Sequence, residues 1–429
     1  LEGIPFFRQL VSISHQTYGK YKSGENGCLF GLRRIGKTSA LLAVKRYMAY
    51  RDEPAIFVDC SETSFHRRRW FEALNFLITS ITKSLSTLNI SGLHQETDYD
   101  DKNASQCFQD DLINIYKTVG SKRILLILDE IENITFEISP SDHWAKDKDY
   151  IFFWQSLRSL FQKSETSHLF SFVISGVNPK AIETSTVHGF DNPIYRFVTP
   201  LYLPLFEMQE VKEMVLSIGT YMGLRFDDEV YTYLTDDFGG HPFLIRQVCS
   251  RIHKSIREQR PFTVTKFYYQ KERSKLNASI QDYIDLIVTV LRERYKDEYE
   301  MLELLAQKDY KTFNDYVEMS RSMIEHLEGY GLISEDNNKY HFRINAVEQF
   351  IKERTKISKV LNTKEDKWSE ISAQRNALET NLRKLIKRTL KLHFGSVKAK
   401  EIFLETISPP ERKAKLNTLS FDDVFESSL

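Results

Sequence analysis

One segment of the chain, residues 31–38, carries the residue types and spacing needed to hold a string of phosphate groups. It reads GLRRIGKT and matches the pattern G-x4-G-K-[ST] at every fixed position. Gly31 and Gly36 permit positive φ angles, so several backbone N–H groups can turn inward as an anion-binding nest. The Lys37 ammonium then reaches the β- and γ-phosphates, and the Thr38 hydroxyl ligates Mg²⁺. The pattern predicts binding of a nucleoside triphosphate with Mg²⁺.

Two adjacent carboxylates, Asp129 and Glu130, follow the uninterrupted apolar run 124–128. A run that is apolar at every position fits a strand buried on both faces, and therefore a parallel sheet. Such a strand would place Asp129 at the carboxyl edge of the sheet, beside the phosphates, where it holds Mg²⁺ through the ion's water shell. Glu130 could then orient or deprotonate the attacking water. The alternative is a strand that ends in a solvated acidic turn, and we expect Glu132 to be an exposed helix residue.

Polar side chains also follow the apolar run 169–174. Ser175 or Asn178 could sense the γ-phosphate by a hydrogen bond to it or to the attacking water. The equally simple alternative is a turn followed by the N-cap of the next helix.

Hydrophobic periodicity predicts the elements that must position these side chains. Strands are expected at 27–30, 55–58, 123–128 and 169–174, with 196–205 as a fifth candidate interrupted by Pro200 and Pro204. Helices are expected at 38–50, 64–85, 108–119 and 151–163. Residues 1–27 are mixed and polar with glycine breakers, and 91–106 and 137–149 are loop-like. Strands that alternate with helices predict an α/β architecture.

The pattern changes after Phe206. Residues 207–260 and 266–307 are mostly helical, and a strand–turn–strand at 332–344 follows helices in the outline of a winged helix. A charged linker is expected at 357–370, before at least two further helices. We therefore predict four domains: a nucleotide domain at 1–206, a helical lid at 207–297, a winged-helix-like domain at 298–356 and a basic helical region at 357–429.

Composition limits the classes of protein that remain. The 429 residues include 59 Lys+Arg and 59 Asp+Glu, so the net charge of zero excludes a globally basic nucleic-acid binder. The four cysteines form no CxxC pair, which argues against a zinc ribbon or disulfide framework and fits a reducing cytosol. No apolar run approaches the roughly 18 residues of a membrane span, and no signal peptide is recognisable. We expect a cytoplasmic protein without a membrane partner, and the initial Leu1 indicates a trimmed or partial chain.

Several motifs together resemble one family. They are GLRRIGKTS at 31–39, LLILDE at 125–130, SGVNP at 175–179, NPIYR at 192–196, LPL at 203–205 and FGGHPFL at 238–244. Over about residues 5–355 the chain resembles the STAND class of P-loop ATPases, close to archaeal-type ATPases and origin-recognition AAA+ proteins. The resemblance implies an ASCE/AAA+ type parallel sheet with helices on both faces, followed by a helical lid and a winged-helix-like domain. The repeats that often follow the lid in full STAND receptors are not found in this sequence.

The resemblance also implies a function: a switch that ADP holds closed and ATP opens, often into oligomers, in bacterial or archaeal defence or signalling. His241 and Pro242 would lie near the nucleotide's base and phosphates, unless they only start a helix. Arg196 would neutralise the γ-phosphate in cis or reach a neighbouring subunit, unless it is a surface arginine. Arg33 and Arg34 would contact the nucleotide or a neighbouring subunit, unless Arg34 is a solvated loop residue, and Ser39 would contact the nucleotide. A partner effector protein or self-association is expected.

The C-terminal segment 381–400 contains seven Lys or Arg and no acidic residue, and its apolar positions fall on one helical face. It could pack as a solvated helix, contact nucleic acid, or carry nuclease chemistry, because Arg388 and His393 resemble the R-x4–6-H motif of HEPN ribonucleases. The helix at 313–331 of the winged-helix candidate is acidic and fits a regulator better than a DNA reader.

Three functional hypotheses therefore remain: an ATP-hydrolysing switch, a DNA-binding initiator-like ATPase, and a non-catalytic scaffold that assembles on nucleotide. No NKxD guanine-reading motif follows the acidic strand, which favours ATP over GTP.

Overall fold

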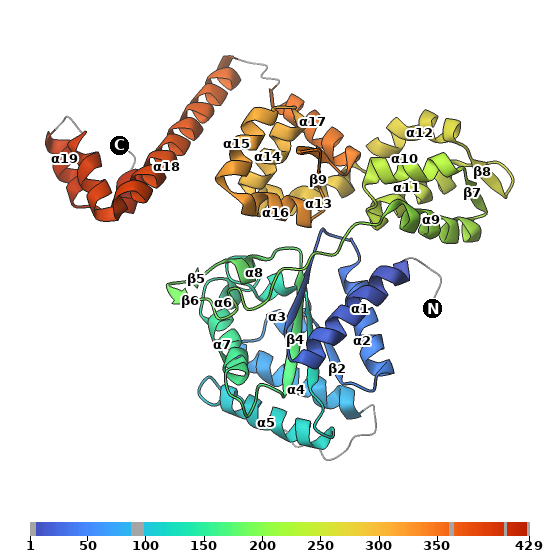
Figure 1. The fold of residues 1–429 in the computed structure, drawn as a ribbon, viewed down its shortest axis with the longest axis horizontal. Coiled ribbons are helices and arrows are strands. Elements are labelled where there is room, and N and C mark those ends of the chain that lie inside the picture. The colour runs from blue at the N-terminus through green and yellow to red at the C-terminus, as the bar shows by residue number, and fades with distance from the viewer. Residues whose placement is uncertain (1–5, 87–97, 360–363, 407–409, 427–429) are drawn as a thin grey trace. The chain divides into compact units, whose positions relative to one another are not determined.

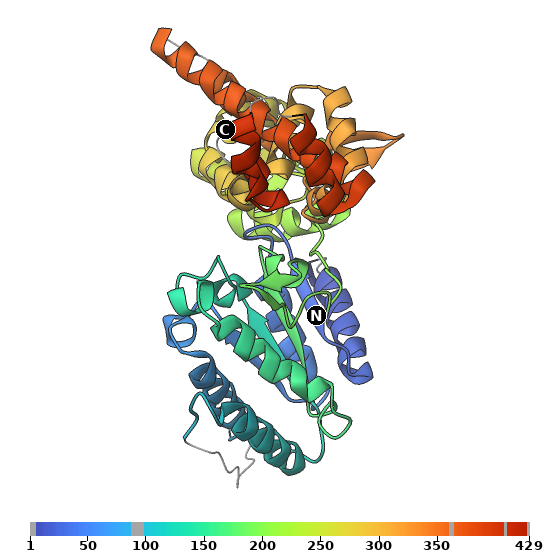
Figure 2. The ribbon, with the colours of Figure 1, turned by 90° about the vertical axis from the view of Figure 1, so that its left-hand side faces the viewer.

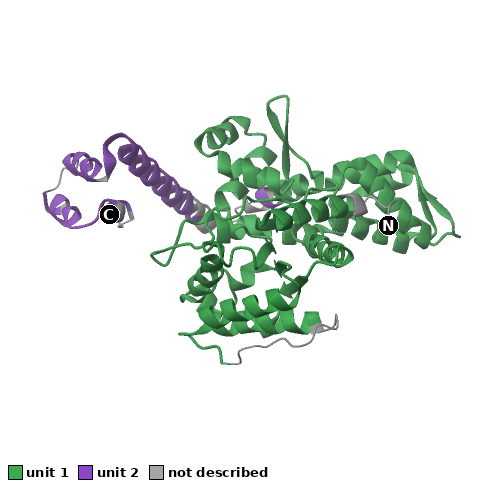
Figure 3. Cartoon of the chain, turned by 60° about the horizontal axis from the view of Figure 1, so that its bottom comes forward, with its two compact units in different colours: residues 1–353 green, residues 354–429 purple. Residues whose placement is uncertain are grey.

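A computed structural model describes residues 6–86, 98–359, 364–406 and 410–426. The chain forms two compact units, residues 1–353 and residues 354–429 (Figure 3). Each unit is described by itself below.

A four-stranded parallel sheet lies at the centre of the nucleotide domain, with the strand order β1-β4-β3-β2. The strands are β1 (Gly27–Phe30), β2 (Ala55–Asp59), β3 (Ile124–Asp129) and β4 (Phe170–Gly176). In the register, Asp59 lies beside Asp129 and Phe30 beside Gly176. Because all four strands run in the same direction, the segments that follow their carboxyl ends meet at one edge of the sheet.

Helices cover both faces of this sheet (Figures 1 and 2). One face packs against α1 (Phe6–Ser23) and α2 (Lys37–Tyr50), and the other against α4 (Trp70–Ser86), α5 (Ala104–Thr118) and α7 (Asp149–Phe161). Side chains alternate along each strand: in β3, Leu125 and Ile127 join the core on the α1 side, and Leu126 and Leu128 join the core on the other. The predicted α/β fold with helices on both faces is confirmed.

The helix α1 was not expected, because the segment looked polar and contains Gly19. A Cβ at Gly19 would meet nothing within 4 Å, so the glycine lies on the open side of the helix and does not end it. Leu10, Ile13 and Tyr21 face the core instead. The Tyr21 hydroxyl lies 2.6 Å from the carbonyl oxygen of Arg123, to which it donates, and this contact ties the end of α1 to the start of β3.

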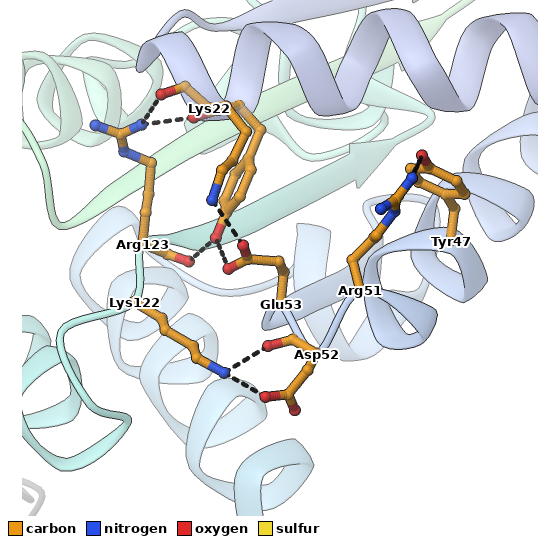
Figure 4. Close-up of polar contacts among 8 residues, drawn as sticks. Lys22, Tyr47, Arg51, Asp52, Glu53, Lys122 and Arg123 are labelled. Carbon is orange, nitrogen blue, oxygen red and sulfur yellow. Dashed lines mark hydrogen bonds and ion pairs between the residues drawn. The ribbon is translucent and has the colours of Figure 1, made fainter.

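Ionic contacts secure the same amino-terminal edge of the sheet (Figure 4). The Lys22 ammonium lies 2.9 Å from a carboxylate oxygen of Glu53, and Lys122 pairs with Asp52 at 2.5 Å. These contacts join α1 and the start of β3 to the turn between α2 and β2. They lie at the edge opposite the carboxyl ends of the strands.

The fifth predicted strand, 196–205, is reduced to a single parallel bridge between Phe30 and Tyr202. Phe30 N–H donates to Leu201 O at 2.7 Å, and Leu203 N–H donates to Phe30 O at 2.8 Å. Pro200 and Pro204 flank this bridge, and since proline has no N–H to donate, the ladder cannot extend. The segment 137–149, expected to be a loop, contains the short helix α6 (Asp142–Ala145), and α5 takes in residues 104–106.

Short elements follow the strands of the sheet: α3 (Thr63–His66) after β2, the 3-10 helix η1 (Ile131–Ile134) after β3, and α8 (Lys180–Glu183) with the short pair β5 (Thr186–Val187) and β6 (Phe190–Asp191) after β4. A helical module, residues 207–294, then contains α9 (Met208–Met222), β7 (Leu224–Phe226), α10 (Asp228–Phe238), α11 (Pro242–Ser255), β8 (Phe262–Val264), α12 (Lys266–Ala278) and α13 (Gln281–Arg294). The strand β7 interrupts the segment 207–260, which the sequence predicted as mostly helical, and β8 falls between the two predicted helical segments.

A second module, residues 295–353, which we call the hairpin module, contains three helices, an antiparallel strand pair and most of a fourth helix. Its elements are α14 (Lys296–Ala306), α15 (Tyr310–Met319), α16 (Arg321–Gly329), β9 (Ile333–Asp336), β10 (Lys339–Phe342) and most of α17 (Asn345–Lys359). One continuous apolar core joins the α1 face of the sheet to both modules.

The C-terminal unit is built on the long helix α18 (Lys364–Glu405), which is broken at Gly395, with α19 (Pro410–Asn417) and α20 (Phe421–Glu426). Its small core includes Leu404, Leu416 and Phe425. The linker predicted at 357–370 is wrong in its described part, because α17 continues to Lys359 and α18 starts at Lys364. Within the described residues, no helix combines the length and apolarity that a membrane crossing requires.

Candidate functional site

The predicted phosphate loop lies between the end of β1 at Phe30 and the start of α2 at Lys37. Gly36, at the N-cap of α2, has a φ of 114°, a conformation open to glycine and strained for other residues. No side chain caps the first turn of α2, so its N–H groups stay available to an anion. The strand–loop–helix arrangement that the sequence motif requires is therefore present.

Lys37 is held inside this loop. Its ammonium donates to the carbonyl oxygens of Gly31 and Leu32, at 3.1 Å each, and only 5% of the residue is exposed. Burial lowers the pKa of Lys37, and the nearby carboxylates of Glu130 and Glu132 oppose that shift. Phosphate oxygens are stronger partners for an ammonium than neutral carbonyls, so a bound nucleotide would draw this side chain onto its phosphates.

Thr38 and Asp129 come together as the sequence predicted for a magnesium site. The Thr38 hydroxyl donates to Oδ2 of Asp129 at 2.6 Å, and the backbone N–H of Glu130 donates to Oδ1 at 3.0 Å. Within the described residues, no cluster of three or more His, Cys, Asp or Glu could hold a metal ion alone. Two protein oxygens, completed by phosphate oxygens and water, are the donor set that Mg²⁺ prefers.

A cavity of about 590 Å³ opens beside these residues. Its lining includes the phosphate loop, the ends of three strands and the helix α13, through Arg33, Thr38, Asp59, Glu130, Asn178 and Arg294. Glu130 has a left-handed backbone, with φ 53° and ψ 47°, directly after the strand. A polar cavity of this size against the phosphate loop can receive a nucleotide.

Glu132, on η1, is half-buried, contrary to the expectation of an exposed helix residue. One carboxylate oxygen accepts the Val177 N–H at 3.1 Å, and the other makes no hydrogen bond within the described residues. Burial, and next the charge of Glu130, raise the pKa of Glu132 to about 7. A Cβ at Gly176 would overlap this carboxylate. The sequence missed this contact because Glu132 and the end of β4 meet only in the folded chain.

The two candidate γ-phosphate sensors differ in position. Ser175 is fully buried, and its hydroxyl makes no hydrogen bond within the described residues. Asn178 lines the cavity, and its Oδ1 accepts from the Lys180 N–H at 2.9 Å, which is the turn-capping role of the alternative. The same oxygen accepts from the Tyr295 hydroxyl at 2.9 Å. Ser175 and Asn178 both stay predictions as sensors.

His241 is fully buried at the N-cap of α11, and Pro242 occupies the first turn of that helix. His241 Nε2 lies 3.2 Å from the carbonyl oxygen of Arg33, so it carries the proton and donates. Burial lowers the pKa of His241 to about 4, and the ring is neutral at pH 7. Since Arg33 belongs to the phosphate loop, this bond joins the helical module to the loop, while a direct contact of either residue with nucleotide stays a prediction.

The three remaining residues that were predicted to contact the nucleotide, Arg34, Ser39 and Arg196, lie outside the lining of the first cavity. The Arg34 guanidinium lies 5.0 Å from the centre of the Phe243 ring, and Ser39 is exposed on α2. Arg196 lines a second cavity, of about 560 Å³, beside Tyr195. Arg33, by contrast, is among the residues that line the first cavity.

On α18, Arg388 and His393 are both exposed. Five positions along a helix turn the side-chain direction by about 140°, so the two do not share a face. The helix alone does not assemble the predicted nuclease pair.

The sequence also missed contributors to the cavity from outside the motifs. Asp59 ends β2 beside Asp129, and the convergence of parallel strand ends could have found it. Glu293 and Arg294 come from the end of α13, more than 250 positions after the phosphate loop, and no local pattern marks them.

No protein-family model matches the chain, and no curated protein matches it by sequence. Among solved structures, a Walker-type ATPase of Pyrococcus abyssi aligns with 79% of this chain and 94% of its own, at 15% identity and a TM-score of 0.50. A RuvB variant of Thermotoga maritima aligns at 12% identity, over 77% and 89% of the chains, with a TM-score of 0.34. DnaA bound to AMPPCP and single-stranded DNA aligns at 13% identity, over 64% and 67%, with a TM-score of 0.33. The chain has the α/β fold of P-loop ATPases.

Proposed function

We propose that the chain binds Mg²⁺–ATP at the phosphate loop and hydrolyses it, as a switch of the STAND/AAA+ type. The observation that carries the proposal is the hydrogen bond between Thr38 and Asp129 beside the buried Lys37. This contact supports the proposal because it joins a residue of the phosphate loop to the carboxylate expected to hold Mg²⁺, next to a cavity that can receive a nucleotide.

The protein's own groups would divide the work of the reaction. The loop N–H groups and Lys37 bind the phosphates, while Thr38 and Asp129 hold Mg²⁺, which neutralises charge on the phosphates. Glu130, at the cavity wall, orients a water molecule and accepts its proton as the water oxygen bonds to the γ-phosphorus. The bond from the γ-phosphorus to the bridging oxygen breaks, leaving ADP and phosphate.

We further propose, from the family resemblance, that the switch acts in defence or signalling in a bacterium or archaeon, through a partner effector or a second copy of the chain. The acidic character of α15 and α16, with Asp315, Glu318, Glu325 and Glu328, disfavours the DNA-binding alternative.

Nucleotide binding and turnover by the Lys37→Ala variant test this proposal. We expect ATP turnover to fall by at least about 100-fold, because the lysine stabilises charge on the transferring phosphoryl group. Lys117→Ala, an exposed lysine on α5, is the matched control and should behave as the wild type. A Lys37→Ala variant that binds and hydrolyses ATP like the wild type would refute the proposal.

A further inference from the structure

Residues 177–183, between the end of β4 and the end of α8, are held from two sides. We call them the post-β4 segment. On the nucleotide side, Glu132 accepts the Val177 N–H, and Asn178 lines the cavity. The segment therefore carries Asn178, a side chain that can contact a γ-phosphate bound in the cavity, and whatever fixes the segment also fixes that side chain.

The hairpin module holds the segment from the other side with two tyrosine hydroxyls. Tyr330 donates to the carbonyl oxygen of Val177 at 2.6 Å. The Tyr295 hydroxyl lies 2.9 Å from Asn178 Oδ1 and 3.1 Å from Glu183 Oε2. Tyr330 is 1% exposed, so its hydroxyl is bonded where water does not compete.

A charged bridge supports the Tyr295 contact. His326 Nε2 lies 2.7 Å from Glu183, and His326 Nδ1 lies 2.8 Å from Glu298. Only an imidazolium donates from both nitrogens. Burial lowers the pKa of His326, but the bonds to the two carboxylates outweigh it and raise the pKa to about 9. The ring of Tyr295 packs edge-on against the imidazole at 4.7 Å between centroids.

These contacts fix which atom of the Asn178 amide accepts and which is left to donate. Its Oδ1 accepts the Lys180 N–H at 2.9 Å, and the Tyr295 hydroxyl, whose one proton is shared between Asn178 Oδ1 and Glu183, supports the same orientation. The amide NH₂ is then the group left for a cavity ligand, and it can only donate. A donor is what the oxygens of a γ-phosphate require, so the Lys180 N–H fixes, and the Tyr295 hydroxyl supports, the amide orientation that suits a triphosphate.

The geometry points to Tyr295 as a positioning residue for the γ-phosphate step. Through Tyr295 the hairpin module controls ATP turnover, and the Glu183–His326–Glu298 bridge secures the module in that position. The inference rests on the proposed ATPase function. Coupling of this kind is reciprocal. A nucleotide that binds Asn178 must therefore also change the strength with which the hairpin module is attached to the post-β4 segment.

The kinetic test compares Tyr295→Phe, Asn178→Ala and the double variant with the wild type. We expect Tyr295→Phe to lower kcat about fivefold or more, the effect of one hydrogen bond, with KM for ATP changed less than about twofold. The double variant should be no slower than Asn178→Ala, because the tyrosine acts through the asparagine. Tyr310→Phe, an exposed tyrosine on α15 of the hairpin module, should match the wild type. Wild-type kinetics for Tyr295→Phe, or losses that add in full in the double variant, would overturn the inference.

A second measurement separates this inference from the proposed function. Hydrogen exchange of the post-β4 segment is followed without nucleotide in the wild type, Tyr295→Phe and His326→Ala. We expect faster exchange at 177–183 in both variants, although His326 is 143 positions from Glu183 in the sequence. Unchanged exchange in both would contradict the attachment, whereas absence of ATP turnover in the wild type would refute the function alone.

Discussion

Thr38 and Asp129 are 91 positions apart in the sequence, and a hydrogen bond of 2.6 Å joins their side chains. This juxtaposition could be predicted, because the loop motif fixes its own backbone and because parallel strand ends converge. The proposed magnesium site rests on these two residues. Its chemistry would depend on the Asp129 carboxylate, which would offer Mg²⁺ a charged oxygen.

Replacing Asp129 with Asn should therefore remove the metal-dependent part of nucleotide binding. We expect the ATP affinity of Asp129→Asn in Mg²⁺ to fall at least about tenfold, while its affinity in EDTA stays that of the wild type. Calorimetric titration in both conditions measures the two affinities. An equal loss in Mg²⁺ and in EDTA would mean that Asp129 supports the fold and not the metal.

Alanine substitutions at Gly176 and Gly19 are expected to change the stability of the fold in opposite directions. Gly176→Ala should destabilise the fold by about 1–3 kcal/mol, because a Cβ there overlaps the Glu132 carboxylate. Gly19→Ala should stabilise it by about 0.5–1 kcal/mol, because the position is helical and open. Urea unfolding of both variants measures the difference. A neutral Gly176→Ala would show that the Glu132 contact is not tight.

The limits of sequence reasoning at this scale are visible in Glu132, Asn178 and Arg294. Each belongs to the site through a contact between segments distant in the chain. Residue type and local spacing do not predict contacts between distant segments. The motif residues Lys37 and Thr38 could be placed because their partners lie in the same motif or at the same sheet edge.

At the scale of elements, the four strands of the sheet were predicted to within two residues at each end, including β2, which alternates buried and half-buried residues. The helix α1 was missed, because its three inward residues are spread over a segment that is otherwise polar. The fifth strand was overpredicted, because its apolar residues outweighed two prolines in the pattern. The winged-helix outline has the expected order of three helices and a hairpin, and its assignment stays a prediction.

The His326 bridge predicts that the stability of the hairpin module depends on pH. The pKa of His326 in the folded chain, about 9, exceeds the ordinary value of 6.5. The stabilisation is therefore complete below about pH 6.5 and is lost as the pH rises through 9. We expect His326→Gln to lower the free energy of unfolding by on the order of 2 kcal/mol at pH 6, and the difference to shrink towards pH 10. Because Glu183, Glu298, Glu325, Arg196, Tyr202 and Tyr295 surround the imidazole, the control is the same series in Glu183→Gln. A difference that grows with pH would contradict the assignment.

The basic face of α18 allows the predicted contact with nucleic acid to be tested. Lys384, Arg388 and Lys391 are exposed along it, and the apolar Leu382 and Leu385 occupy another side of the helix. If this face contacts RNA, replacing the three basic residues with Gln should weaken binding of a single-stranded RNA and flatten its salt dependence. We expect a loss of at least about tenfold at low salt. Wild-type protein that fails to bind RNA would leave α18 as a packing or solvated helix.

At the scale of the whole molecule, one apolar core runs from the α1 face of the sheet through the helical module into the hairpin module. The cavity beside the phosphate loop has walls from the sheet edge and from α13, so the helical module is part of the candidate site. The bonds His241–Arg33 and Tyr295–Asn178 attach each module to a segment that would touch phosphate. These attachments are what the proposed switch requires, because ATP hydrolysis at the site would then change the packing between the modules and the sheet.

The central claim is that this site hydrolyses ATP, and Glu130→Gln tests it most directly. Turnover and the identity of the bound nucleotide are measured for the wild type and the variant side by side. The account predicts that the wild type releases phosphate, whereas Glu130→Gln binds ATP with wild-type affinity, turns over at least about 100-fold more slowly and retains ATP. Equal turnover in both proteins would contradict the role of Glu130, and no turnover in either, with nucleotide bound, would favour an assembly scaffold over an enzyme.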